Sequence, residues 1–323
     1  MRLNWGILGL GKIANKFVID LAMVEDCHLS AVASRSEDRA MQFGEQYNAD
    51  QFYASYEQLF SDEEVDIIYI ATPHNSHFKY AMEAMNHGKH VLCEKPLAVN
   101  RKEVNQLILA SKTNNVFLME AFWSRFNPSI EAVLDHVQNK DIGEVNFISA
   151  DFSFYKDADP ESRLFNMDLA GGALLDIGVY PIFLSYLIMG YPEEIVAKAI
   201  KHKTGTDLQT SAILKYKEGF SNIMCGFGSN SDMVARIFGT EGRISIDEVW
   251  HESQGYKIEK DESTESFNLP TKGKGFTYEI EECLRCISEG KIESEKWSHQ
   301  DSLNLISICD DIRNQIGLKY PFE

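Results

Sequence analysis

The chain has 323 residues, and because domains cluster at roughly 100–200 residues, this length predicts two domains. Hydrophobic residues make up 44% and charged residues 25% of the sequence, as in ordinary globular proteins. The net charge of −18 and the lack of any Lys/Arg-rich run disfavour nucleic acid and anionic membranes as partners. No signal-peptide pattern opens the chain, and no apolar run reaches the ~18–20 residues of a membrane span. We therefore expect a cytoplasmic protein.

The cysteines predict a protein without disulfides and without a metal. All six are scattered through apolar segments, which is typical of buried free thiols. Only Cys283 and Cys286 have ligand-like spacing, and neither a second pair nor a nearby histidine completes a set of four ligands. We expect both cysteines to belong to a helix core.

The first third of the chain predicts a doubly wound, Rossmann-type α/β sheet, because short apolar runs alternate with helix-period stretches. The expected strands are Asn4–Leu8, Leu29–Ser34, Asp66–Ala71, His90–Cys93 and Val116–Glu120. The expected helices are Lys12–Met23, Ser36–Tyr47, Ser76–His87 and Arg101–Thr113. We place this NAD(P)-binding domain at residues 1–123.

Residues 124–323 predict an α+β domain with a large, mainly antiparallel open sheet, because long alternating runs suit a sheet with one covered face. A helix to about Gln138 precedes the expected strands, which are Val145–Phe154, Glu194–His202, Thr210–Lys217, Ser221–Gly228 and Met233–Ile246. The pairs Glu218-Gly219 and Glu241-Gly242 predict hairpin turns between neighbouring strands. The other expected helices are Gly172–Met189, Phe276–Glu289 and His299–Ile316. The last of them is expected to pack back on the first domain.

A glycine-rich turn predicts a dinucleotide site. Gly9-Leu10-Gly11-Lys12-Ile13-Ala14 follows a strand and opens a helix, which is the context that gives a G-x-G-x-x-A match its meaning. Gly9 permits the tight turn, Gly11 lets the backbone approach a pyrophosphate, and the small Ala14 allows close packing of helix and strand. Lys12 and Ile13 open the helix whose N-terminus would bind the anion.

The end of the second strand favours NADP over NAD. An NAD site places an acid about 20 residues after the glycines, whereas an arginine there suits the 2′-phosphate of NADP. The sequence has Arg35 between the hydroxyls of Ser34 and Ser36, with Arg39 one turn later. The nearby acids Glu37 and Asp38 keep NAD open as an alternative.

A lysine also falls at the carboxyl edge of the predicted sheet, where open α/β sheets bind ligands. It lies in Cys93-Glu94-Lys95-Pro96-Leu97, and the same edge carries Thr72-Pro73-His74. A lysine in a partly desolvated cleft can donate a proton or hold a substrate hydroxyl. His74 and His77 have the helical spacing of metal ligands, but a role in lining the cofactor site is the stronger interpretation because no carboxylate ligands accompany them.

Together these motifs resemble the Gfo/Idh/MocA family of oxidoreductases. The resemblance covers almost the whole chain and adds Ala71–His77 and Gly171–Tyr180 to the glycine turn and Glu94-Lys95-Pro96. Many members have a histidine four residues after the aspartate of the last motif, where this chain has Tyr180 after Asp176. This resembles the branch that contains dimeric dihydrodiol dehydrogenases and NADP-dependent D-xylose dehydrogenases, in which a tyrosine is the acid/base.

The resemblance implies further roles. Glu94 matches the family position that contacts the nicotinamide ribose, and Pro96 follows a cis peptide in relatives. Trp123 and Arg125 resemble a segment that the dihydrodiol branch places beside the substrate, although packing at the domain junction explains them equally well. Phe152 and Phe154 are open to the same two interpretations.

The residues themselves favour one mechanism. Asp176 and Tyr180 are four apart on a helical pattern and so share a face. A nearby ammonium favours the phenolate of a tyrosine. We expect Tyr180 to take the proton as hydride moves to the nicotinamide, Lys95 to orient the substrate and Asp176 to bind a hydroxyl; anchoring of an apolar helix is the alternative for Tyr180.

The leading hypothesis is therefore an NADP-dependent dehydrogenase of a sugar, polyol or trans-dihydrodiol. The alternatives are a catalytically silent NAD(P)-binding regulator, an NAD-preferring sugar dehydrogenase, and a lyase or glycosidase that holds NAD tightly. Relatives commonly pair their C-terminal sheets, so we expect a homodimer or homotetramer.

Overall fold

The computed structural model describes residues 2–157 and 159–323, which form two compact units. Unit 1 contains the chain up to Arg125 together with Lys272–Leu303. Unit 2 contains Phe126–Thr271 and Asn304–Glu323. The sequence predicted one domain boundary, between residues 123 and 124. In the structure the later segment Lys272–Leu303 also belongs to unit 1.

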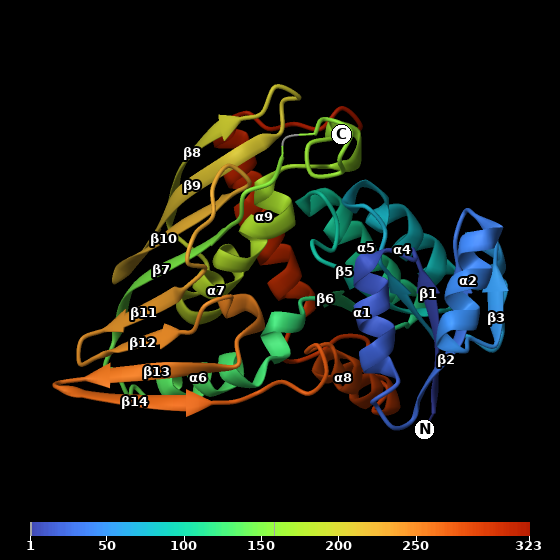
Figure 1. Cartoon of the computed structure of the whole chain (residues 1–323), viewed down its shortest axis with the longest axis horizontal. Helices are drawn as coiled ribbons and strands as arrows, with labels where there is room; N and C mark the ends of the chain where they lie inside the picture. The colour runs from blue at the N-terminus through green and yellow to red at the C-terminus, as the bar shows by residue number, and fades with distance from the viewer. Residues whose placement is uncertain (1, 158) are drawn as a thin grey trace. The chain divides into compact units, whose positions relative to one another are not determined.

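Unit 1 is built on a six-stranded parallel sheet in the order β3-β2-β1-β4-β5-β6 (Figure 1). Its strands are β1 (Leu3–Leu8), β2 (Cys27–Ala33), β3 (Gln51–Tyr53), β4 (Ile67–Ile70), β5 (His90–Glu94) and β6 (Leu118–Ala121). The order reverses between β1 and β4, which is the switch point at which such sheets bind ligands. The predicted Rossmann sheet is confirmed; β3 was not predicted.

Helices connect the strands of this sheet. They are α1 (Lys12–Leu21), α2 (Glu37–Tyr47), α3 (Tyr56–Ser61), α4 (His77–Asn86) and α5 (Arg101–Asn114), and α8 (Thr277–Ser288) joins them from later in the chain. Two short 3₁₀ turns, η1 (His74–Ser76) and η2 (Trp123–Phe126), follow β4 and β6. Helix α8 contacts α1, where the buried carboxylate of Asp20 accepts hydrogen bonds from the backbone N–H groups of Lys274 and Phe276, both at 2.8 Å. Asp20 thereby caps the start of α8.

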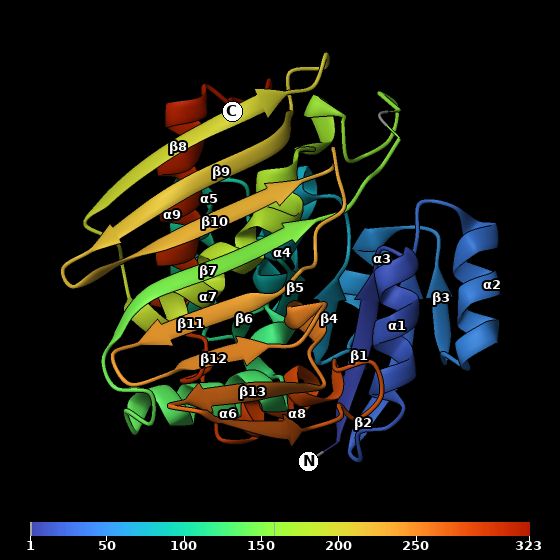
Figure 2. The ribbon, with the colours of Figure 1, turned by 60° about the vertical axis from the view of Figure 1, so that its left-hand side comes forward.

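Unit 2 is built on an eight-stranded sheet in the order β14-β13-β12-β11-β7-β10-β9-β8 (Figure 2). Its strands are β7 (Val145–Ser153), β8 (Glu194–Lys201), β9 (Asp207–Tyr216), β10 (Gly219–Gly226), β11 (Ala235–Gly239), β12 (Arg243–Ile246), β13 (Gly255–Lys260) and β14 (Ser263–Asn268). All neighbours are antiparallel except β7 and β10. The mainly antiparallel sheet and both hairpin turns are confirmed. The run Met233–Ile246, predicted as one strand, forms the separate strands β11 and β12.

Helices cover one face of this sheet. They are α6 (Pro128–Gln138), α7 (Val179–Met189) and the later part of α9 (His299–Ile316), with the 3₁₀ turns η3 (Met167–Leu169) and η5 (Trp250–Glu252) and a π-helical turn, η4 (Leu174–Gly178), directly before α7. Helix α7 contacts β7 and β10, and the buried side chains beneath it include Ile148 and Ile223.

One helical segment of the described residues has the length and composition of a membrane span. Met167–Met189 is long and apolar enough by length and composition, with a mean hydropathy of 1.7. Because 78% of its most apolar window is buried within the structure, its apolarity is that of a core helix.

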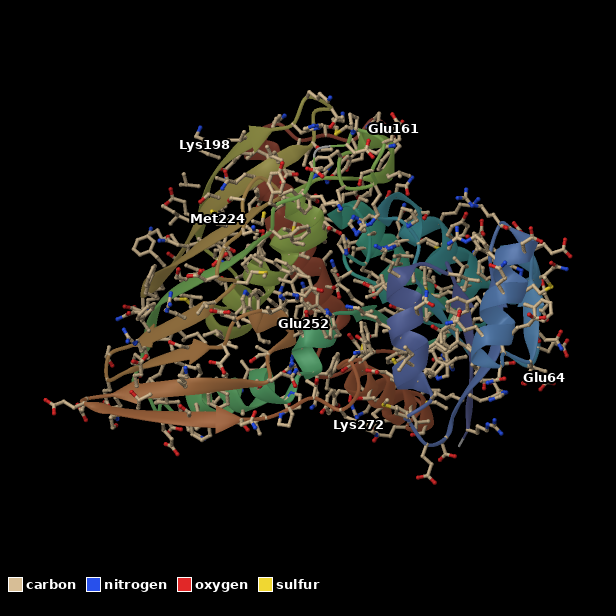
Figure 3. All side chains as sticks on the ribbon, viewed as in Figure 1. Glu64, Glu161, Lys198, Met224, Glu252 and Lys272 are labelled. Atoms are coloured by element: carbon tan, nitrogen blue, oxygen red, sulfur yellow. The ribbon has the colours of Figure 1, made fainter. Side chains whose placement is uncertain are left out.

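The other face of the sheet in unit 2 carries exposed apolar side chains. Val196 and Ile200 on β8, Ile213 on β9 and Phe220 on β10 are each between 47% and 61% exposed. Lys198 and Met224 project from the same strands (Figure 3). Exposed apolar side chains gathered on one sheet face are typical of interaction faces.

Candidate active site

The turn after β1 has the shape that its glycines predict. Gly9 has φ +94°, and a Cβ there would lie 2.7 Å from the carbonyl oxygen of Ala71, so the position requires glycine. Gly11 is the N-cap of α1, and no described atom lies within 4 Å of a Cβ built on it. This open space lets a phosphate approach the first turn of α1, which begins with Lys12 and Ile13, where N–H groups and the helix dipole attract an anion.

An arginine of α2, the helix that follows β2, contacts the glycine turn. The guanidinium Nη2 of Arg39 donates to the carbonyl oxygen of Leu10 at 3.1 Å. The hydroxyl of Ser34 accepts the N–H of Ser36 at 3.2 Å, which shapes the strand end. Arg35 hydrogen-bonds Tyr56, and this contact opposes the rise in the pKa of Tyr56 that burial causes.

The two acids near this strand end lie in a helix. Glu37 and Asp38 occupy the exposed first turn of α2, where the helix dipole favours negative charge. Arg35 and Arg39 are both exposed. The strand end thus presents guanidinium groups, which suit a phosphate monoester, rather than a carboxylate for a ribose hydroxyl.

His77 links two loops at the carboxyl edge of the sheet. Its Nε2 lies 2.9 Å from the carbonyl oxygen of Thr72, and its Nδ1 lies 2.8 Å from that of Pro96. Each ring nitrogen faces a carbonyl oxygen, and a nitrogen that carries a proton donates to the oxygen that it faces. The ring is fully buried, which suits a structural link between the two loops. His74, also buried, makes an edge contact with His77, with 5.6 Å between ring centroids.

The Glu94-Lys95-Pro96 turn follows β5. Its Lys95–Pro96 peptide bond is cis, as the resemblance implied. Glu94 is buried, and the hydroxyl of Tyr69 donates to its Oε1 at 2.5 Å. Burial raises the pKa of Tyr69 well above its ordinary value, so its hydroxyl keeps the proton. Lys95 is half-buried, which suits a group that must reach a ligand.

Trp123 and Arg125 have structural contacts inside unit 1. The ring of Trp123 stacks on that of Phe276, with centroids 4.9 Å apart and planes 7° apart. The Nε of Arg125 donates to the carbonyl oxygen of Lys296 at 2.8 Å. Packing therefore explains part of the role of both residues, and contact with a substrate stays a prediction.

In unit 2, Asp176 and Tyr180 lie in adjoining helical turns. Asp176 lies in the π-helical turn η4, and Tyr180 lies in the first turn of α7. They are 7% and 6% exposed, respectively, so both are buried but reach the surface. Single π-helical turns are frequent at functional sites because they redirect side chains.

A buried aspartate holds the start of this segment. Oδ2 of Asp207, on β9, accepts the backbone N–H of Leu174 and the hydroxyl of Thr210, both at 2.8 Å. Gly172 has φ +128°, and a Cβ there would lie 2.1 Å from Oδ1 of Asp207. Burial raises the pKa of Asp207 to about 6. The close approach of this carboxylate explains why position 172 is a glycine.

Aromatic rings surround Tyr180. The ring centroids of His251 and Phe152 lie 5.1 Å and 5.4 Å from that of Tyr180, and that of Trp250 lies at 6.5 Å. His251 stacks on Phe152 with 4.0 Å between centroids. Phe154 directly follows β7 and packs on Phe227, with 5.2 Å between ring centroids. The surroundings of Tyr180 therefore suit an apolar or ring-shaped substrate face.

Three residues near Asp176 and Tyr180 were not predicted. They are Arg163, whose Nη1 pairs with Oδ1 of Asp176 at 2.9 Å, and the neighbours Asp207 and His251. Only the Trp250-His251 pair carried a signal in the sequence, as an aromatic pair between two polar stretches. Arg163 and Asp207 act across 13 and 33 residues, respectively. Among residues 2–157 and 159–323, no group of three or more His, Cys, Asp or Glu is arranged to hold a metal.

Two family models match the chain. Residues 3–122 match the Gfo/Idh/MocA oxidoreductase family, described as an NAD-binding Rossmann fold. Residues 130–245 match the Gfo/Idh/MocA C-terminal domain.

Relatives of known name match over their full length. The chain is 36% identical to trans-1,2-dihydrobenzene-1,2-diol dehydrogenase of Xenopus tropicalis, over 99% of this chain and 100% of the relative. It is 34% identical to the NADP(+)-dependent scyllo-inositol 2-dehydrogenase of Bacillus subtilis, over 99% and 98%. Among solved structures, a 3-ketoreductase of Actinomadura kijaniata in complex with NADP and TDP-benzene is similar, with a TM-score of 0.89, 26% identity and 98% of both chains covered.

Proposed function

This chain belongs to the Gfo/Idh/MocA family of oxidoreductases, and from that premise we propose that it transfers hydride between a C–OH carbon of a small polyhydroxylated molecule and NADP. The observation that carries the proposal is Tyr180, buried in the first turn of α7 directly after the π-helical turn that holds Asp176. A sugar, a cyclic polyol and a trans-dihydrodiol share the secondary alcohol that this chemistry needs.

The residues of unit 1 fit NADP. Gly9 and Gly11 shape the turn for the pyrophosphate, and Arg35 and Arg39 offer guanidinium groups to the 2′-phosphate. Thr72, Pro73, His74 and His77 border the nicotinamide half, and Glu94 binds its ribose. When bound, the nicotinamide supplies the hydride acceptor at its C4 atom.

The catalytic work of the chain's own residues is proton transfer and orientation. Tyr180 accepts the proton of the substrate hydroxyl as the C–H bond breaks, and returns it in the reverse reaction. Lys95 hydrogen-bonds the reacting oxygen and favours the phenolate through its charge. Asp176 accepts a hydrogen bond from a neighbouring hydroxyl. Trp123, Arg125 and Phe154 border the substrate.

The names of the relatives support this substrate class. One oxidises a cyclic dihydrodiol and another an inositol, and both therefore act on vicinal hydroxyls carried by a six-membered ring. The aromatic surroundings of Tyr180 suit such a ring.

Turnover assays test the proposal. Purified protein is incubated with NADP, or with NAD, and a panel of aldoses, inositols and trans-dihydrodiols, and reduced nicotinamide is followed by its absorbance. We expect turnover with NADP and a loss of about 100-fold or more in kcat for Tyr180→Phe, with NADP affinity unchanged. Tight NADP binding without turnover would instead favour a silent regulator, and cofactor retained through dialysis would favour a lyase or glycosidase.

We also propose a cytoplasmic homodimer or homotetramer that pairs the exposed apolar sheet face of unit 2. The side chains Val196, Ile200, Ile213 and Phe220 support it because such surface is usually covered. Light scattering after size-exclusion chromatography tests the mass.

A further inference from the structure

A buried carboxylate beside the Lys95 turn has no part in the mechanism above. Glu120 lies on β6, the strand next to β5, and is only 2% exposed. A buried carboxylate is costly unless hydrogen bonds and opposite charge compensate it. The hydrogen bonds and charges around Glu120 therefore indicate its role.

Glu120 accepts hydrogen bonds from both sides. The backbone N–H of Leu97 donates to Oε1 at 2.9 Å, and the indole Nε1 of Trp297 donates to Oε2 at 3.0 Å. Ser302 gives a further side-chain hydrogen bond. The N–H donors cannot accept, so the site is shaped for an unprotonated carboxylate.

The same carboxylate interacts with the charge of Lys95. Burial raises the pKa of Glu120, while the hydrogen bonds from Ser302, Trp297 and Leu97 and the charge of Lys95 oppose that rise. Lys95 and Leu97 are two residues apart on one turn. Glu120 therefore holds the backbone of the turn through Leu97, and the charge of Lys95 favours its ionised form.

The turn is also held at its other end. The carbonyl oxygen of Pro96 faces Nδ1 of His77 at 2.8 Å. Adjacent residues of the turn thus contact a carboxylate and an imidazole ring. Two such contacts fix the direction in which Lys95 leaves the sheet edge.

We propose that Glu120 is a positioning residue for Lys95, which it serves by fixing the Lys95-Pro96-Leu97 turn and by compensating the ammonium charge. The inference rests on the proposed function for the role of Lys95 in turnover. The contact between Glu120 and the turn can nevertheless be tested without turnover.

The test compares three variants by two readouts. Glu120→Gln removes the charge at nearly constant shape, and Trp297→Phe removes one donor but keeps a ring. Asp20→Asn is the matched control, since Asp20 is an equally buried carboxylate in unit 1 that accepts backbone N–H groups away from the turn. The readouts are kcat and KM for NADP, and the rate of reductive methylation of Lys95, measured by mass spectrometry of its peptide.

For Glu120→Gln we expect kcat to fall about 30-fold with KM for NADP within about threefold, because a small displacement of a catalytic group costs rate. Labelling of Lys95 should become several-fold faster, because loss of the carboxylate favours the neutral amine. Trp297→Phe should lower kcat by about three- to tenfold. Asp20→Asn should lower the melting temperature but leave kcat and labelling within about twofold.

Equal kcat losses in Glu120→Gln and Asp20→Asn, with Lys95 labelling unchanged, would overturn the inference. If Glu120→Gln does not fold, Trp297→Phe decides by the same readouts, and unchanged kcat and labelling in that variant would overturn it. If the wild-type protein turns over no substrate, the proposed function fails, while the labelling comparison still tests the contact between Glu120 and Lys95.

Discussion

The guanidinium Nη1 of Arg163 lies 2.9 Å from Oδ1 of Asp176, the carboxylate that we assign to a substrate hydroxyl. The arginine side chain is 53% exposed and that of the aspartate 10%. An ion pair with an exposed partner contributes little to the free energy of unfolding. We therefore assign this pair to orienting the carboxylate of Asp176.

Arg163→Gln should therefore raise KM for the alcohol substrate about tenfold and change kcat and the melting temperature little. Steady-state kinetics at saturating NADP measure both constants. Arg243→Gln is the matched control, because Arg243 forms a comparable pair with Glu259 at 2.6 Å and is 49% exposed. An equal change of KM in both variants would contradict a specific role for Arg163.

Arg35→Ala should discriminate between the two cofactors. Loss of one charge-assisted contact to the 2′-phosphate should weaken NADP binding about 10- to 100-fold and NAD binding by less than about threefold. Arg39→Ala should weaken both, because Arg39 also donates to Leu10 in the glycine turn. Fluorescence titrations of both reduced cofactors measure these affinities, and equal losses for Arg35→Ala would mean that the strand end binds no phosphate.

Asp207 predicts a pH-dependent stability. Its pKa is raised from 3.8 to about 6 in the folded protein, mainly by burial. The stability that its protonated form contributes is therefore complete below pH 3.8 and is lost as the pH rises through about 6. Relative to Asp207→Asn, the wild-type protein should lose up to about 3 kcal/mol between pH 4 and pH 7.

Urea unfolding of both proteins at four pH values measures that difference. Thr210→Val removes one donor to Asp207 and should move the transition to higher pH, because the ionised form loses a hydrogen bond. A stability difference that stays constant with pH would show that Asp207 does not titrate in this range.

Periodicity predicted most of the fold because most elements bury one face. The strands that it missed lack that signal: β3 has three residues, β13 buries only its first two residues, and β14 is an edge strand whose side chains are almost all exposed. Edge strands need no alternation, since neither face is covered. The return of Lys272–Leu303 to unit 1 rests on contacts with residues far earlier in the chain, among them Asp20, more than 250 residues before Lys274.

The sequence predicted those parts of the site whose residues lie close together in the chain. The glycine turn, the arginine strand end and the Lys95 turn each occupy one short segment at a strand end, and the structure places all three in unit 1. The π-helical turn at Asp176 was predicted as plain α-helix, because its shape depends on Asp207 in a later strand. Glu120 was predicted only as the last residue of a strand. The neighbouring sequence does not distinguish a carboxylate that binds a turn from one that faces water.

His77→Gln should raise KM for NADP about tenfold. The ring nitrogens of His77 contact the carbonyl oxygens of both Thr72 and Pro96, whereas the glutamine side chain can reach only one of the two loops. Steady-state kinetics with varied NADP measure KM. An unchanged KM would show that the contacts of His77 do not position these loops for the cofactor.

Tyr69→Phe should weaken cofactor binding without loosening the sheet. The variant removes the hydroxyl that donates to Glu94 at 2.5 Å, but keeps the ring that stacks on Phe17 with 3.7 Å between centroids. Because Glu94 is assigned to the nicotinamide ribose, KM for NADP should rise about five- to tenfold. Tyr53→Phe is the control, since it removes a hydroxyl that donates to Asp62 at 3.0 Å in the same unit. If the two variants bind NADP equally well, the bond from Tyr69 does not orient Glu94, and the ribose contact must be assigned to another residue.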